Sequence, residues 1–169
     1  MRPFIIVATL VGIVAIGAVE GGPPRKEDIP KLINALKTSP TGKARAQAAE
    51  DIGARGAIRA SDIENAIDPL LSALKADKDA DVRKACAKAL GGTASYADKC
   101  VPALTDALKD NAQPVQIAAA KALGQYGSDA KSALPALQDI AAKKDDKKLS
   151  PVAAAAVKQI MGVEKKKKG

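Results

Sequence analysis

The sequence contains no histidine and no tryptophan, and aromatic residues make up only 2% of it. Without histidine, neither a Ser-His-Asp nor a Cys-His nucleophile can form, and no other side chain has an ordinary pKa near neutrality. Two cysteines are too few for a four-ligand zinc site, and no convergent carboxylates for an oxygen-ligand site are evident. We therefore predict a protein that is not an enzyme, with no cofactor, metal site or small-molecule substrate.

What the chain does contain is an internal repeat marked by proline. Asp68-Pro69, Val101-Pro102 and Leu134-Pro135 follow one another at a spacing of 33 residues, and each precedes a run close to Leu-x-x-Ala-Leu. An earlier copy begins at Ile29-Pro30. Periods of this length are typical of solenoids, whose units bury their apolar faces only by stacking on one another.

Each unit is predicted to contain two helices, of which the second has the clearer pattern. Residues 80–91 align with residues 113–124, and both segments end in Ala-Leu-Gly. One apolar stripe of the first segment has helical spacing and consists of Val82, Ala85, Cys86, Ala89 and Leu90. Such small side chains allow neighbouring helices to approach closely. Gly91 and Gly124 stand where a left-handed helix cap is expected, and the Ser61 to Glu64 segment has capping-box spacing, which predicts a helix start before Pro69.

These residues resemble the HEAT-like repeats of the phycobilisome-lyase type. Units of that type pair an x-Pro-x-Leu-x-x-Ala-Leu helix with an Asp-x-x-Val-Arg-x-x-Ala-x-x-Ala-Leu-Gly helix, and the match is closest over residues 79–91. The resemblance covers roughly residues 29–162 and implies an all-α, right-handed solenoid of about four helix pairs. It also implies a scaffold that binds other proteins; a lyase-type enzyme is the catalytic alternative.

The resemblance further implies a ladder of arginine and aspartate along the stack. Arg83 is matched by Arg45 in the first unit but replaced by Gln116 and Ala153 in the last two. The ladder is therefore expected only in the first half of the array.

The N-terminal segment is apolar and predicts export. Residues 4–19 carry no charge and follow Arg2, so residues 1–19 are predicted to be a secretory signal peptide. The alternative is an uncleaved membrane anchor, although the stretch is short of the roughly 20 residues that span a bilayer. Cleavage would remove only Arg2 from a net charge of +8. We thus expect a basic periplasmic or secreted protein, or one anchored at a membrane.

The remaining chain divides into a linker, a repeat domain and a tail. The linker spans residues 20–25 and the repeat domain residues 26–162, with units at about 26–60, 61–96, 97–128 and 129–162. The basic tail, residues 163–169, contains Lys165, Lys166, Lys167 and Lys168. It is either a solubilising tail or a contact with an anionic surface. Sequence-specific nucleic-acid binding is not expected, because no aromatic platform accompanies these lysines.

The candidate binding residues lie on the second helices. If unit four carries an insertion of four residues, Lys88, Lys121 and Lys158 occupy one position on successive helices. This position is on the side that usually lines a solenoid's groove, and a positive stripe there favours an acidic protein or another polyanion as partner. A solvated helix face is the other interpretation, and Glu50 interrupts the stripe in unit one. The full candidate set is Arg83, Lys84, Lys88, Gln116, Lys121 and Lys158.

Two cysteines and two tyrosines complete the candidates. Cys86 and Cys100 either form a disulfide between units two and three or are separately buried thiols. Tyr96 and Tyr126 follow the second helices and are predicted to pack over helix ends.

Overall fold

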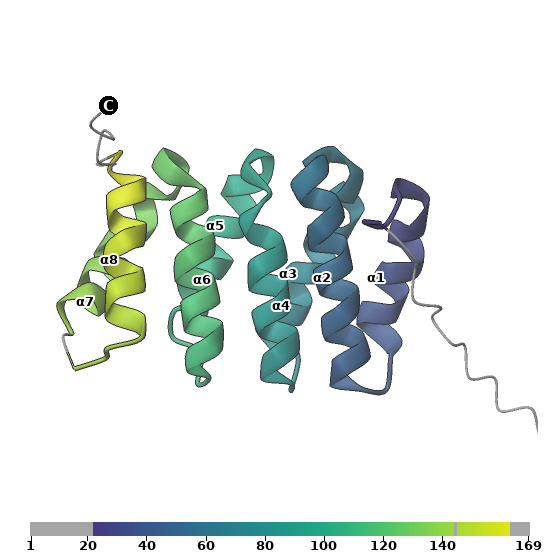
Figure 1. The fold of residues 1–169 in the computed structure, drawn as a ribbon, viewed down its shortest axis with the longest axis horizontal. Coiled ribbons are helices and arrows are strands. Elements are labelled where there is room, and N and C mark those ends of the chain that lie inside the picture. Colours follow the sequence, from purple (N-terminus) through teal and green to yellow (C-terminus); the bar gives the residue numbers. More distant parts are fainter. Residues whose placement is uncertain (1–21, 144, 163–169) are drawn as a thin grey trace, which may run out of the picture.

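The computed structural model describes residues 22–143 and 145–162, and within these residues it contains helices and no strands. The predicted signal peptide or anchor and the basic tail lie outside the described residues. Figure 1 shows α2, α4, α6 and α8 side by side in one layer, with α1, α3, α5 and α7 behind them. The predicted all-α solenoid of four helix pairs is confirmed. The pairs are α1 (Ile29–Thr38) with α2 (Gly42–Ile58), α3 (Glu64–Ala76) with α4 (Ala80–Gly91), α5 (Ala97–Ala107) with α6 (Gln113–Gln125), and α7 (Leu134–Ala142) with α8 (Leu149–Ile160).

A short 3-10 helix precedes each first helix, and these are η1 (Lys26–Asp28), η2 (Ala60–Ile63), η3 (Ala94–Tyr96) and η4 (Gly127–Ala133). The second unit begins before Pro69, as expected, and Pro69 lies inside α3. The predicted capping box at Ser61 is wrong, because α3 starts at Glu64 without a side-chain cap.

The second helices are held together by contacts between glycine and alanine. A Cβ atom added to Gly53 would lie 2.9 Å from the Cα of Ala89, and one added to Gly91 would lie 3.0 Å from the Cα of Ala122. The same atom on Gly124 would lie 3.2 Å from the Cα of Ala156. These glycines are therefore required by the close approach of the next helix.

The prediction of left-handed caps at Gly91 and Gly124 is wrong. Among the described residues, positive φ angles occur at Gly127 and Gly162 instead. The second helices approach one another more closely than the first helices do. At each junction the second helices are therefore the more tightly packed layer of the stack.

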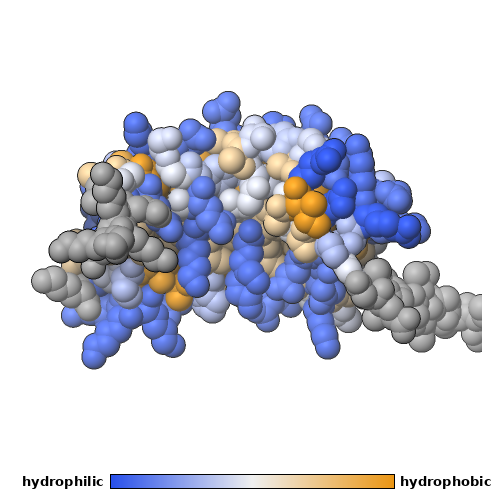
Figure 2. All heavy atoms as spheres, turned by 45° about the horizontal axis from the view of Figure 1, so that its top comes forward, coloured by the Kyte–Doolittle hydropathy of each residue, from blue (hydrophilic) through white to orange (hydrophobic). Residues whose placement is uncertain are grey.

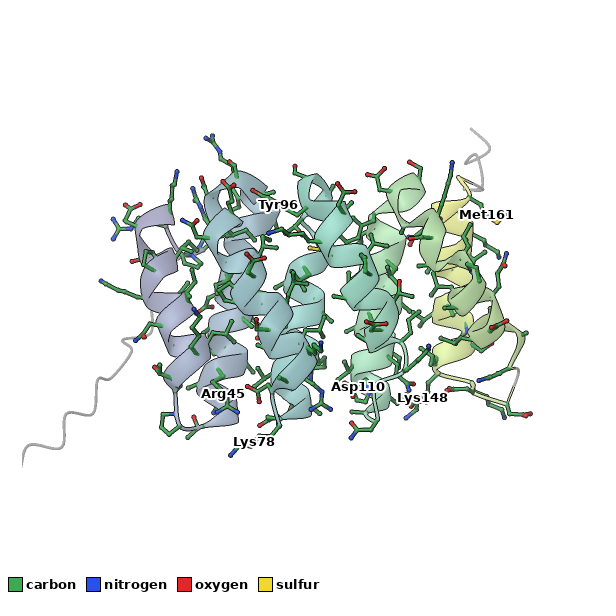
Figure 3. All side chains as sticks on the ribbon, turned by 180° about the vertical axis from the view of Figure 1, so that it is seen from behind. Arg45, Lys78, Tyr96, Asp110, Lys148 and Met161 are labelled. Carbon is green, nitrogen blue, oxygen red and sulfur yellow. The ribbon has the colours of Figure 1, made fainter. Side chains whose placement is uncertain are left out.

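Two arginines join successive units at one edge of the stack. Arg45 donates to both carboxylate oxygens of Asp77, at 2.7 and 2.8 Å, and to the carbonyl of Ser39 in its own unit at 3.0 Å. Arg83 repeats the arrangement with Asp110, at 2.7 and 2.9 Å, and with the carbonyl of Asp77 at 2.8 Å. Arg45 and Asp110 lie along this edge in Figure 3. Each guanidinium thus connects its own loop to the loop of the next unit.

The second half of the array has a weaker version of the ladder, as predicted. Gln116 donates to the carbonyl of Asp110 at 2.7 Å, but no carboxylate bond from Gln116 is found among the described residues. Gln113 instead donates to both carboxylate oxygens of Asp146 at 3.0 Å. Ser150 donates to the carbonyl of Ala141 at 2.8 Å. Ser150, rather than Ala153, is therefore the counterpart of Arg83 in unit four.

The ladder makes stability depend on pH. Hydrogen bonding by Arg45 and Arg83 lowers the pKa of Asp77 and Asp110 below the ordinary 3.8. A carboxylate with a lowered folded-state pKa stabilises the fold fully above its ordinary pKa, and this contribution is lost as the pH falls through the lowered value. The free energy of unfolding should therefore decrease as the pH drops below about 4.

Substitution Arg83→Gln should separate the two contacts of this arginine, one within its own unit and one with the next unit. The shorter side chain can keep the bond to the carbonyl of Asp77, as Gln116 does in unit three, but it loses the pair with Asp110. We expect the free energy of unfolding in urea at neutral pH to fall by about 2 kcal/mol. The loss on acidification should also be smaller than in the wild type, because the pKa of Asp110 is no longer lowered by Arg83.

Lys99→Gln is the control, since Lys99 pairs with Asp68 in an exposed position and should contribute less than about 1 kcal/mol. Equal stability of Arg83→Gln and the wild type at neutral pH, with the same acid dependence, would contradict this role of the ladder.

Candidate interaction surface

The outward surface of α2, α4, α6 and α8 is called the front face below. Residues at equivalent positions on these helices form rows across the front face. The glycine contacts show which positions are equivalent, because each glycine meets an equivalent alanine of the next unit. Ala89 and Ala122 are separated by 33 residues, and Ala122 and Ala156 by 34. Gln125 and Gln159, also 34 residues apart, approach Gly91 and Gly124 in the same way. Unit four is therefore shifted by one residue relative to unit three, not by four.

This shift corrects the predicted row of lysines. Lys88 and Lys121 are equivalent, but the residue of unit four in that row is Ala155. Lys158 lies three residues further along α8, at the position that glycine occupies in the other units. The row thus reads Glu50, Lys88, Lys121 and Ala155.

In the N-terminal half of the front face, the lysines have acidic neighbours. The Nζ atom of Lys88 lies 3.3 Å from a carboxylate oxygen of Glu50, and that of Lys84 lies 2.5 Å from Asp81. Lys84 is half-buried and the other three side chains are exposed, so each pair is open to solvent and contributes little stability. They nevertheless reduce the positive field that this half presents to a partner.

The C-terminal half of the front face is different, because neither α6 nor α8 contains an acidic residue. Lys121 is exposed and forms no ion pair with any residue that the structure describes. A groove runs between the two helices, lined by Lys121, Gln125, Pro151, Val152, Ala155, Ala156 and Gln159. This half therefore combines apolar surface with an unneutralised positive charge.

Two residues of the predicted set have structural roles instead. The side chain of Arg83 is 11% exposed and forms the ladder contacts with Asp110. Gln116 uses its amide to hold the carbonyl of Asp110. Neither is placed on the part of the surface that we consider for binding.

The cysteines do not form the disulfide that the sequence allowed, since both thiols are free and buried. Burial raises the pKa of Cys86 to about 12, so its thiol is a poor nucleophile near neutrality. Cys100 lies 3.7 Å from the hydroxyl of Thr93, which is 2.8 Å from that of Tyr126. Tyr126 donates to the carbonyl of Leu90 at 2.6 Å and so packs over the end of α4, as predicted.

Large apolar side chains are exposed only singly among the described residues. Ile58 is 58% exposed in the first pair and Met161 is 56% exposed after the last. Figure 2 shows the hydrophobic atoms of one face in small patches toward the two ends of the stack.

In residues 22–143 and 145–162, no cluster of three metal-binding side chains is found. None of the helices within these residues is both long and apolar enough to span a bilayer.

The sequence comparisons agree with this architecture. The family model of HEAT repeats matches residues 29–94 and 67–158, which together include most of the helices described above. No curated protein matches the chain significantly. HEAT repeats generally serve as scaffolds for protein interaction and are typically not enzymes. The fold, the repeated contacts and the extent of the match show that the chain belongs to the HEAT repeat family.

Proposed function

We propose that this protein is a non-catalytic scaffold whose front face binds an acidic protein. The observation that carries the proposal is the absence of acidic residues from α6 and α8, next to an exposed Lys121 without an ion-pair partner among the described residues. Charge of one sign on a surface attracts partners of the opposite sign and raises their rate of association. The buried Cys86 thiol gives no support to the lyase-type alternative.

We also propose that the scaffold acts outside the cytoplasm, exported or anchored by residues 1–19. The support is the sequence alone: an uncharged apolar stretch that follows Arg2. N-terminal sequencing should give a mature end near residue 20 in the extracytoplasmic fraction of the host if the segment is cleaved, or Met1 in the membrane fraction if it is an anchor. Recovery of the whole chain, with Met1, from the soluble cytoplasm would contradict export.

The test of the scaffold compares two pairs of charge reversals. Lys88→Glu with Lys121→Glu changes the front face, and Lys37→Glu with Lys75→Glu changes exposed positions on the first helices by the same net charge. Immobilised wild-type protein and both variants are exposed to the extracytoplasmic fraction, and retained proteins are identified by mass spectrometry. We expect the front-face variant to retain specific proteins at least about tenfold less, a loss of about 1.4 kcal/mol in binding free energy.

The variant of the first helices should retain the same proteins as the wild type. The proposal fails if both variants lose them equally, or if the front-face variant retains them all.

A further inference from the structure

We infer that the groove between α6 and α8 binds a protein segment in which carboxylates stand beside apolar side chains. This inference rests on the proposed function and gives it a location and a type of partner.

The groove is produced by one change in the row of lysines. Lys88 extends a long side chain from α4 toward Glu50 of α2, and Lys121 is its equivalent on α6, whereas the equivalent residue of α8 is Ala155. A methyl group leaves open the space that a lysine stem covers elsewhere. The floor is formed by exposed Pro151 and Ala155 and half-buried Val152, and buried Ala156 lies beneath it.

The polar groups of the groove lie at its margins. Lys121 supplies a charge on the α6 side, and the amide of Gln159 lies over Gly124 of α6, whereas the amide oxygen of Gln125 lies toward Gly91 of α4. Because α6 and α8 lack acidic residues, no carboxylate of these helices competes for Lys121. An apolar side chain would lie against the floor while a neighbouring carboxylate pairs with the lysine.

A labelled peptide that alternates glutamate and leucine is a direct probe of this chemistry. Binding to the full chain is followed by fluorescence anisotropy. We expect Lys121→Glu and Ala155→Glu each to weaken binding at least about tenfold, since the first reverses the charge and the second fills the floor with a carboxylate. Lys37→Glu, on α1, should bind as the wild type does. Added salt should weaken the wild-type complex.

Three outcomes would overturn the inference: no binding of this peptide, equal binding of a lysine and leucine peptide, or no effect of Lys121→Glu and Ala155→Glu. Preferential binding to vesicles of anionic lipid, with the same dependence on Lys121, would also overturn it in favour of a lipid surface. If the peptide fails while Lys84→Glu with Lys88→Glu abolishes retention of protein partners, the scaffold remains and only this location is rejected.

A separate observation leads us to propose that both ends of the stack are closed to a further repeat and to a second copy of the chain. Every internal junction places a glycine against an alanine backbone. At the C-terminal end the position of that glycine holds Lys158, and at the N-terminal end the position of that alanine holds Asp51. Neither side chain fits an internal junction, where a Cβ atom added to the glycine would already lie 2.9 to 3.2 Å from the Cα of the facing alanine.

Removing both charges tests this proposal. Lys158→Gly with Asp51→Ala recreates the internal pair of residues at the two ends, and we expect the weight-average mass in sedimentation velocity to rise above that of one chain as concentration increases. The matched control, Lys121→Ala with Glu50→Ala, removes one charge of each sign from the front face and should leave the protein monomeric. End-to-end association of the wild type, or a double variant that is folded by circular dichroism yet monomeric at its highest soluble concentration, would overturn the proposal.

Discussion

The close approach of the second helices is the constraint on which the rest of the structure depends. An added Cβ at Gly53, Gly91 or Gly124 would meet the backbone of the next helix, so each junction has a single register. That register brings Arg45 and Arg83 within reach of the following loop and aligns the outward rows of the front face.

Much of this architecture could be predicted from the sequence because the pattern is repeated. The stripe that contains Val82, Cys86 and Leu90 is buried as expected, since helical spacing alone determines which side faces the core. The restriction of the arginine and aspartate ladder to the first half of the array was also predictable. Each pair requires an arginine at the equivalent position of the second helix and an aspartate in the loop of the next unit. Gln116 shows what remains when the guanidinium is lost: the bond within the unit persists and the bond between units does not.

The features that could not be predicted are those set by contacts between helices. Gly91 and Gly124 end a helical motif. In the sequence, a glycine that caps a helix looks the same as a glycine that is needed for close contact with another helix, and only the position of the neighbouring backbone distinguishes the two roles. The predicted register of unit four was wrong for a similar reason. The length of the loop between α7 and α8 does not show how many extra residues the loop accommodates and how many shift the register of α8. The recurrence of glutamine at Gln125 and Gln159 was the available signal, because both follow the same 34-residue step as the contacting alanines.

The corrected register moves the site from a continuous lysine stripe to one junction. Lys88 faces Glu50, Arg83 belongs to the ladder and Lys158 lies at the end of the stack, so Lys121 beside the groove of α6 and α8 carries the binding hypothesis. The most direct measurement is an NMR titration of the isotope-labelled chain with the glutamate and leucine peptide. The backbone amide shifts should change within residues 113–125 and 149–160, and remain unchanged within residues 29–38 and 64–76. Changes confined to the first helices would contradict a front-face binding site.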